Sequence, residues 1–305
     1  MKANRFLIIY LATMTFLIMG LALSVPAQDT NLDFQAAQAG TDKGDAKAQY
    51  DLARRYERGI GVRRNYFAAG QSARLSAKQG YAPGEVLLGS YYGRGIGFPR
   101  NIKMAVEWYR KAADQGDALA QFAMGGFYAT GRGVTNDMTR AIEWWQKAAA
   151  QNQVEAEARL GELYLIPARP YGTNYLDYPM AIPLLHRAAA QGSAAAMNNL
   201  GTAYENGFGV EHDVKEAAKW YRAAAERGDA MGQASIGQLY FDGRGVPLDL
   251  VQAYEWFKLS ASQGNFLGTE GFNHFQQKPL LTPMQTGEAE QLVADFRVQT
   301  GGVQE

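Results

Sequence analysis

The sequence predicts an all-α protein, a right-handed α-solenoid of about six helix-turn-helix repeats (period 36) with capping helices at both ends. Three observations predict this fold. A small residue precedes each alanine-rich segment, first Gly44 and last Gly264, and it recurs every 36 residues except once, where the spacing is 40. A tyrosine followed by a Gly-x-Gly loop, as in Tyr56 to Val62, recurs in five units. A tryptophan four residues before a pair of small residues, as at Trp108, recurs in four.

The composition is that of a folded protein without the charge pattern of a nucleic-acid binder. Of the 305 residues, 47% are hydrophobic and 20% are charged, which is enough apolar material for a packed core. Lys and Arg together number 30, and so do Asp and Glu, so the clustered basic excess of nucleic-acid binders is missing. The sequence has no cysteine, which excludes disulfides, thiolate metal sites and a cysteine nucleophile.

Residues 1–27 have the three-part pattern of a secretory signal peptide. Basic residues precede an uncharged apolar run from Phe6 to Leu23, and Val25 and Ala27 fit a cleavage site. This run reaches the lower limit of a membrane span, so an uncleaved N-terminal anchor is the alternative. We expect an exported protein, periplasmic in the first instance, with secretion or N-terminal anchoring as alternatives. No membrane span is expected after signal cleavage.

Each repeat is expected to contain two helices, A and B. Helix A begins after a capping residue, as Asp117 does before Ala118, and it ends at the double glycine. Glycines in the middle of helix A, such as Gly125, indicate that helix B lies too close for a side chain. An N-terminal cap segment, 28–43, precedes the repeats at 44–264, whose bounds are 44–79, 80–115, 116–151, 152–191, 192–227 and 228–264. The residues expected to cap the B helices are Asn65, Asn101, Asp137, Asp177, Asp213 and Asp249.

The fourth repeat departs from the pattern, and the chain ends on a different element. The loop 165–177 is longer and lacks the double glycine, and Pro183 is expected to kink or shorten the helix that follows. We interpret this loop as a tolerated variant, with a part in binding as the alternative. Residues 265–305 are expected to hold a partial repeat and a capping helix from Pro283 to about Val298, with Thr282 as its cap.

The repeat resembles the Sel-1-like repeat (SLR), a branch of the tetratricopeptide-type solenoids. Its pattern, A-x-A-x-x-x-L-G-x-x-Y-x-x-G-x-G-V followed by a capping Asp, a Trp and paired alanines, is found at Ala118 to Asn152 and again at Ala194 to Gly228. The resemblance implies a scaffold or adaptor that holds partner proteins. For a bacterial member with a signal peptide it also implies association with the cell envelope or with a host. Some secreted members are cysteine-rich and disulfide-bridged, and this chain departs from them.

No catalytic, cofactor-binding or metal-binding motif is found, so we expect a protein that is not an enzyme and takes no cofactor or metal. The glycine loops follow helices rather than strands and recur with the repeat, so they are interpreted as turns and not as phosphate loops. Neither G-x-S-x-G nor S-x-x-K occurs, and Glu288 and Glu290 are two residues apart, so they do not share a helix face. The histidines, His186, His212 and His274, are interpreted as ordinary surface residues. The recurring aromatic residues are expected in the core, including Trp108, Trp144, Trp145, Trp220 and Trp256.

The non-repeated positions of the A helices are expected to line the concave face, by analogy with tetratricopeptide solenoids. Basic residues of the first two repeats would favour an acidic segment or a C-terminal carboxylate, and a solvated helix face without a ligand is the alternative. The candidate partner-binding residues are Lys47, Tyr50, Arg54, Arg58, Val86, Ser90, Arg94, Leu119, Phe122, Asn198, Thr202 and Glu205.

The sequence therefore predicts a non-enzymatic protein–protein interaction scaffold or adaptor in the bacterial cell envelope, with protein or peptide partners and no nucleic acid. One alternative is a cell-wall or exopolysaccharide-associated factor, either a regulator or an enzyme of unfamiliar type. Another is a secreted host-interaction protein. The fold alone does not decide between these functions.

Overall fold

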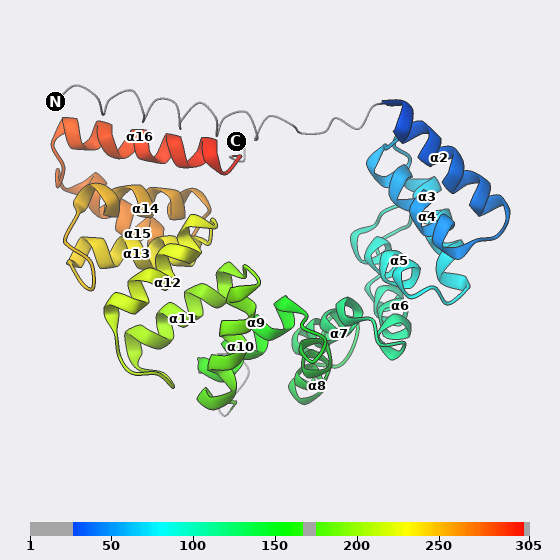
Figure 1. Cartoon of the computed structure of the whole chain (residues 1–305), viewed down its shortest axis with the longest axis horizontal. Coiled ribbons are helices and arrows are strands. Elements are labelled where there is room, and N and C mark those ends of the chain that lie inside the picture. Colours follow the sequence, from blue (N-terminus) through cyan, green and yellow to red (C-terminus); the bar gives the residue numbers. More distant parts are fainter. Residues whose placement is uncertain (1–26, 167–174, 302–305) are drawn as a thin grey trace, which may run out of the picture. The chain divides into compact units, whose positions relative to one another are not determined.

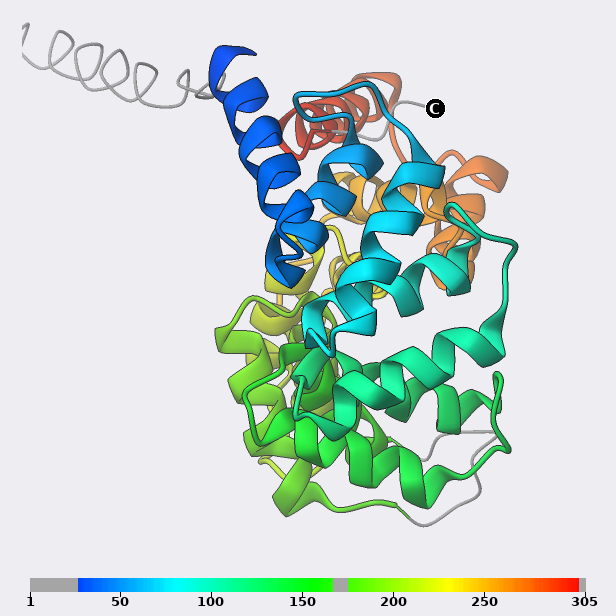
Figure 2. The same cartoon turned by 90° about the vertical axis from the view of Figure 1, so that its right-hand side faces the viewer.

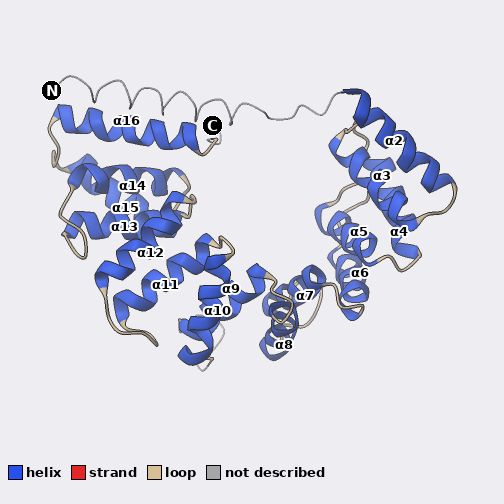
Figure 3. Cartoon of the chain, viewed as in Figure 1, coloured by secondary structure: helices blue, strands red, loops and turns tan. Residues whose placement is uncertain are grey.

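The computed structural model describes residues 27–166 and 175–301, and all regular secondary structure in these ranges is helical (Figure 3). The expected signal peptide, apart from Ala27, and the centre of the long fourth-repeat loop lie outside the described residues. The chain divides into two compact units, Met1–Gln115 (unit 1) and Gly116–Glu305 (unit 2). Unit 1 contains α2 (Ala27–Asp42), α3 (Ala46–Arg58), α4 (Tyr66–Lys78), α5 (Ala82–Arg94) and α6 (Ile102–Asp114). Unit 2 contains α7 (Ala118–Thr130), α8 (Met138–Ala149), α9 (Val154–Leu165), α10 (Tyr178–Ala190), α11 (Ala194–Asn206), α12 (Val214–Glu226), α13 (Ala230–Asp242), α14 (Leu250–Ser262), α15 (Phe266–Gln277) and α16 (Pro283–Gln299).

Consecutive helices pack on one another within each unit (Figure 1, Figure 2). The A helices are α3, α5, α7, α9, α11 and α13, with α15 as the A helix of the partial repeat, and each B helix follows its A helix. A helices of neighbouring repeats also contact each other: α3 with α5 in unit 1, and α9 with α11, α11 with α13 and α13 with α15 in unit 2. This repeat-to-repeat stacking is that of an α-solenoid, as predicted.

The helices begin where the capping residues predict. The side chain of Asp117 accepts a hydrogen bond of 2.8 Å from the backbone N–H of Ala120, which satisfies one of the free donors at the start of α7. All six residues expected to cap B helices accept such bonds, and they are Asn65, Asn101, Asp137, Asp177, Asp213 and Asp249.

The double glycines end the A helices because both of them take left-handed backbone angles. Gly131 ends α7 at φ 67°, and its N–H bonds back to the carbonyl of Phe127. Gly133, two residues on, has φ 77°. An L-residue with a Cβ rarely adopts these angles, so the loop selects glycine for its backbone and not for a ligand.

The glycines in the middle of the A helices lie against large side chains of their own B helix, as predicted. A Cβ added at Gly89 would lie 2.9 Å from Tyr109, and one added at Gly161 would lie 2.6 Å from Leu185. In the first repeat the equivalent pair is Ala53 and Ala73, which are buried in one cluster. The other pairs are Gly125 with Trp145, Gly201 with Tyr221 and Gly237 with Phe257.

The prediction that the tryptophans belong to the core is confirmed for Trp145 and Trp256 and holds only in part for the other three, of which Trp108 packs against the buried cluster of unit 1. Trp108, Trp144 and Trp220 are half-buried on the B helices. The ammonium groups of Lys111 and Lys147 lie 4.0 Å and 4.3 Å from the ring centres of Trp108 and Trp144. These rings therefore sit at the edge of the core, where a cation can cover them.

Helix α10 corrects the expectation for Pro183. The helix has 13 residues, the same length as most B helices, so the proline does not shorten it. Pro183 is exposed, and the hydrogen bond that it cannot donate would have gone to the carbonyl of Pro179, in the first turn. The loss is thus confined to one bond at the start of the helix.

The first helix of unit 1 and the last helix of unit 2 lie outside the repeats, and each packs on its own unit. At the N-terminal end, Phe34 of α2 packs edge-on against Tyr56 of α3, with ring centres 5.7 Å apart. At the C-terminal end, α16 lies on α14 and buries Val293, and it begins with the predicted capping box at Thr282. Within the described ranges, no helix is long and apolar enough to cross a bilayer.

Candidate functional site

The predicted residues of unit 1 lie on two neighbouring A helices. Lys47, Tyr50, Arg54 and Arg58 follow one face of α3, because their spacings of three and four residues match the helical turn. Val86, Ser90 and Arg94 follow one face of α5 in the same way. Because α3 contacts α5, the structure brings these seven residues onto one surface, which we call the α3–α5 face.

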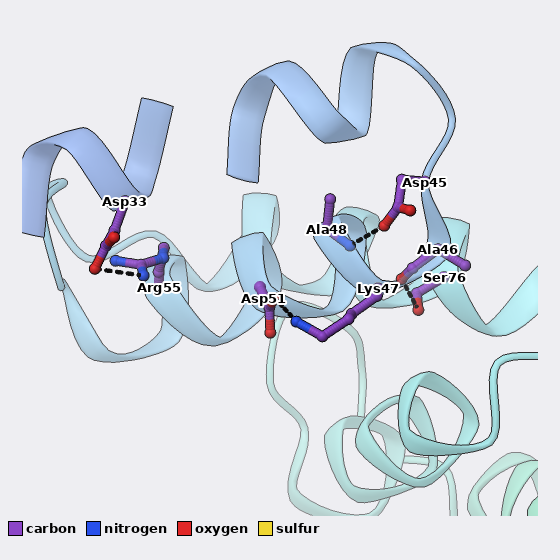
Figure 4. A network of polar contacts seen from close by, with 8 residues as sticks. All are labelled: Asp33, Asp45, Ala46, Lys47, Ala48, Asp51, Arg55 and Ser76. Carbon is purple, nitrogen blue, oxygen red and sulfur yellow. Dashed lines mark hydrogen bonds and ion pairs between the residues drawn. The ribbon is translucent and has the colours of Figure 1, made fainter. Parts of the chain in front are cut away.

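Acidic residues neutralise part of this face. The carboxylate of Glu57 lies 3.6 Å from the guanidinium of Arg54 and 3.3 Å from that of Arg94. Lys47 pairs with Asp51 at 2.8 Å (Figure 4), and this hydrogen bond raises the pKa of Lys47. The net positive charge of the α3–α5 face is therefore smaller than its arginines and lysine suggested.

Among the basic residues of the α3–α5 face, Arg58 is exposed and forms no ion pair within the described part of the chain. Tyr91, on α5, is buried and donates a hydrogen bond of 3.1 Å to Glu57. Burial raises the pKa of Tyr91, so it stays a neutral donor that holds the carboxylate in place. Arg58 and the outer edge of Arg54 are the groups left to receive an anionic partner.

The predicted residues of unit 2 do not form one surface. Leu119 is exposed on α7, and Asn198 and Thr202 are half-buried on α11. Phe122 lines a cavity of about 180 Å³ between α7, α8 and α9. Glu205 lines a separate cavity of about 420 Å³ between α11, α13, α14 and α15.

The larger cavity has an apolar floor and a polar rim. The apolar contribution comes from Leu239, Phe241, Phe257 and Leu267. The polar lining residues are Glu205, Ser235, Gln238, Glu270 and His274. Its volume lies in the range of about 300–1,000 Å³ typical of ligand pockets.

Two groups at this cavity differ in how firmly they are held. Glu205 accepts a hydrogen bond of 2.8 Å from Tyr221, whose pKa burial raises, and it pairs with Arg244 at 3.1 Å. Glu270 is exposed and has no ion pair in the described residues. Glu205 is thus committed to the fold, whereas Glu270 is available to a ligand.

The interpretation of the three histidines as surface residues is only partly correct. His212 is exposed, as predicted. His274 is half-buried, lines the larger cavity and lies edge-on to Phe241 at 5.5 Å. His186 is half-buried and lies edge-on to Trp220 at 5.6 Å, so the prediction is wrong for these two.

The smaller cavity is bounded by the close contact of α7 and α8. The indole N–H of Trp145 donates a hydrogen bond of 3.2 Å to the carbonyl of Phe122. Arg159 and Glu162 form an ion pair of 2.8 Å on α9, and both residues line the opening. The paired charges leave the rim without a net charge.

A ladder of polar pairs joins a buried side chain of helix A to an exposed glutamine at the end of helix B, and sequence reasoning missed it. In the first repeat the side-chain amide of Gln79 donates a hydrogen bond of 2.7 Å to Gln49, thirty residues earlier. The same positions pair as Gln115–Glu85, Gln151–Gln121, Gln191–Glu157 and Gln263–Gln233. The sequence contained a signal for these pairs. A glutamine recurs immediately before the glycine or asparagine in the turn that leads to the next A helix, and a polar residue recurs at the fourth position of helix A. The ladder is structural, since it satisfies buried polar groups.

Glu255 of α14 is a buried carboxyl without a cation. The equivalent residues Glu107, Glu143 and Lys219 are exposed, so the covering helix α16 accounts for the burial. Burial raises the pKa of Glu255 to about 7, against a hydrogen bond from Gln252 and with a contribution from Asp249. At neutral pH this carboxyl therefore opposes the docking of α16.

We expect Glu255→Gln to stabilise the protein at pH 8 and to change little at pH 4. The raised pKa means that folded wild-type protein holds the proton more tightly than the unfolded chain, so wild-type stability falls as the pH rises from about 4.5 through 7. The amide cannot ionise and avoids this loss, which we put at about 2 kcal/mol. Urea denaturation at both pH values measures it, with the exposed Glu143→Gln as control. An equal effect of Glu255→Gln at pH 4 and pH 8 would contradict the explanation.

The site as a whole offers binding groups more than reacting groups. In the described residues no group of three or more His, Asp or Glu side chains is placed to hold a metal ion. The buried tyrosines and carboxylates are tied to one another, as Tyr254 and Lys258 are to Glu290 of α16. Burial opposes ionisation of Glu290, but these hydrogen bonds outweigh it and hold its pKa below the ordinary value.

Known proteins show the same repeat and fold. The Sel1 repeat family model matches residues 46–81, 82–117, 118–153, 154–193, 194–229 and 230–265. A protective antigen present in uropathogenic Escherichia coli strains, which displays an SLR fold, is 34% identical and has a TM-score of 0.80. That match covers 89% of this chain, which spans 57% of the length of the E. coli chain. A Sel1 repeat protein from Oxalobacter formigenes is 28% identical with a TM-score of 0.68, covering 80% of this chain and 96% of that one.

A comparison with proteins that carry curated descriptions gave no match. The family model, by contrast, spans the helix pairs from α3 to α14, residue for residue in the same period that the capping residues and glycine loops define. The chain therefore belongs to the Sel1 repeat family.

Proposed function

We propose that this protein is a non-enzymatic scaffold or adaptor of the bacterial cell envelope that binds partner proteins through the exposed faces of its A helices. Sel1 repeat proteins generally mediate protein–protein interaction, and the family is typically non-catalytic. The proposal assigns this activity to a particular surface of this chain.

The observation that supports this proposal is that the repeats differ in sequence at particular positions of helix A. Positions that recur are used in caps, turns and helix contacts, as Asp117, Gly131 and Gly125 show. One A-helix position that varies between repeats is held by Tyr50, Val86, Phe122, Ala158, Asn198, Ala234 and Glu270, and the last two of these line the larger cavity. A surface whose chemistry changes from repeat to repeat suits recognition of one extended partner.

The envelope location rests on the N-terminal pattern of residues 1–27, which is that of an export signal. The related E. coli chain is a protective antigen, and an antigen of that kind has to be reached by antibodies, which is consistent with export. Fractionation of cells into cytoplasm, periplasm and membranes tests this part of the proposal. Recovery of the protein only from the cytoplasm would contradict it.

We expect Arg54→Ala combined with Arg58→Ala to weaken partner binding at least tenfold and to leave the fold intact. Arg58 has no ion pair in the described chain, and Glu57 keeps Arg94 and Tyr91 when Arg54 is removed. The test is capture of partners from envelope extracts by tagged protein, followed by affinity measurement with the purified partner.

Arg63→Ala with Arg64→Ala is the matched control, because it removes two exposed arginines from the turn after α3. A partner lost with the first pair and kept with the second supports the α3–α5 face. Equal binding by both double variants would rule out this face as the recognition surface.

A further inference from the structure

The larger cavity of unit 2 continues into an exposed apolar strip. Leu267, at the start of α15, lines the cavity and is 53% exposed. Met231 holds the equivalent position at the start of α13, and Phe266, beside Leu267, is 72% exposed. Helices α13 and α15 contact each other, so exposed apolar side chains lie at the starts of two neighbouring helices, and one of them, Leu267, belongs to the cavity lining. Exposed apolar surface next to a cavity is typical of a binding site for another chain.

The carboxylates that line the cavity are those of Glu205 and Glu270, beside the polar side chains of Ser235, Gln238 and His274. Glu270 lies at its rim, and Gln238 of the lining donates a hydrogen bond of 2.8 Å to the exposed Asp242. The lining contains no lysine or arginine. The neighbouring cation, Arg244, is already paired with Glu205. The local charge therefore attracts a cation and repels an anion.

We propose that this cavity binds a peptide segment of a partner protein in which an aromatic or leucine side chain is followed closely by a lysine or arginine. The apolar side chain enters between Phe241, Phe257 and Leu267, and the cation pairs with Glu270. This inference rests on the proposed scaffold function and deepens it by naming the chemistry of the partner. It differs from the α3–α5 face, whose arginines favour an acidic segment.

The apolar side chain of the peptide and its cation contribute to binding in different ways. The aromatic floor contributes apolar burial, which salt does not screen, whereas the Glu270 pair is exposed and is screened by salt. An exposed pair of this kind adds little affinity by itself. Its main effect is the choice between basic and acidic peptides, because a like charge at this position is repelled.

The test uses three fluorescein-labelled peptides and the chain without its expected signal peptide, residues 28–305, in fluorescence anisotropy titrations. The peptides are Gly-Ser-Phe-Lys-Ser-Gly-amide with fluorescein on its N-terminal amine, the same labelled peptide with glutamate for lysine, and the same labelled peptide with alanine for phenylalanine. We expect the Phe-Lys peptide to bind at least fivefold more tightly than either of the others. Failure of all three peptides to bind at millimolar concentration would overturn the proposal.

Two variants and two matched controls locate the site. Glu270→Lys is expected to reverse the preference, so that the Phe-Glu peptide binds more tightly than the Phe-Lys peptide. Leu267→Gln is expected to weaken both peptides at least threefold. Glu226→Lys, an exposed glutamate on α12, and Leu75→Gln, which changes an exposed leucine of α4, should leave binding unchanged.

The outcomes separate this proposal from the scaffold function. A captured partner that is lost with the Arg54/Arg58 variant but binds Glu270→Lys and Leu267→Gln normally would overturn the cavity proposal and leave the scaffold function standing. Reversed peptide preference with no partner recovered from envelope extracts would support the cavity chemistry and count against the envelope scaffold. Thermal melts of each variant confirm that the fold is retained.

Discussion

Replacing Gly125 by alanine is expected to destabilise the protein by about 3 kcal/mol, although alanine is the better helix former. The added Cβ would lie far inside van der Waals contact of the Trp145 ring. That ring is buried and its N–H is hydrogen-bonded to the carbonyl of Phe122, so it has little freedom to move away. The helices α7 and α8 must separate to admit the methyl group. Urea denaturation followed by circular dichroism measures the loss.

The neighbouring Gly126 provides the control within the same helix. A Cβ added there meets no atom within 4 Å, so Gly126→Ala should stabilise α7 by up to about 1 kcal/mol through helix propensity alone. In a Trp145→Ala background, Gly125→Ala should cost nothing, because the clash is gone. The coupling between positions 125 and 145 should therefore be about 3 kcal/mol in a double-mutant cycle. Equal effects of the two glycine substitutions would show that packing against Trp145 is not the reason for the glycine.

Gly125 also shows how much of a structure can be predicted from a sequence with a strong period. The period places Gly125 in mid-helix, and the cost of glycine there predicts a close neighbour. The neighbour itself follows once the period is applied twice, because each glycine faces the residue twenty positions later, except in the longer fourth repeat. Caps and glycine turns are predictable for a simpler reason, since each depends on the backbone of a few adjacent residues.

Contacts that depend on which side chains neighbouring repeats carry could not be predicted from the period. Helical spacing places Arg54 and Arg94 on one face, but it does not show that Glu57 lies between them. The large cavity has no local signature either, because its lining residues come from four helices, α11, α13, α14 and α15. The burial of Glu255 depends on α16, a helix outside the repeat, so its position in the repeat indicated an exposed residue.

Replacing Arg187 by leucine is expected to cost about 3 kcal/mol, because it leaves the carboxylate of Glu157 buried without its cation. The Glu157 side chain is 0% exposed, and its oxygens accept hydrogen bonds of 2.7 Å from Arg187 and 3.0 Å from Gln191. Gln191 alone offers a neutral donor, which compensates a buried charge poorly. Urea denaturation of wild type and variant gives the difference.

The other repeats supply the compensating change. In the first and sixth repeats the buried position of helix A is glutamine, Gln49 and Gln233, and the position of Arg187 is leucine, Leu75 and Leu259. Glu157→Gln combined with Arg187→Leu would give the fourth repeat this neutral pair, with Gln191 still available to bond it as Gln79 bonds Gln49. We expect the double variant to recover most of the stability lost by Arg187→Leu alone. A double variant as unstable as the single one would mean that Arg187 acts through packing of its long side chain and not through the charge of Glu157.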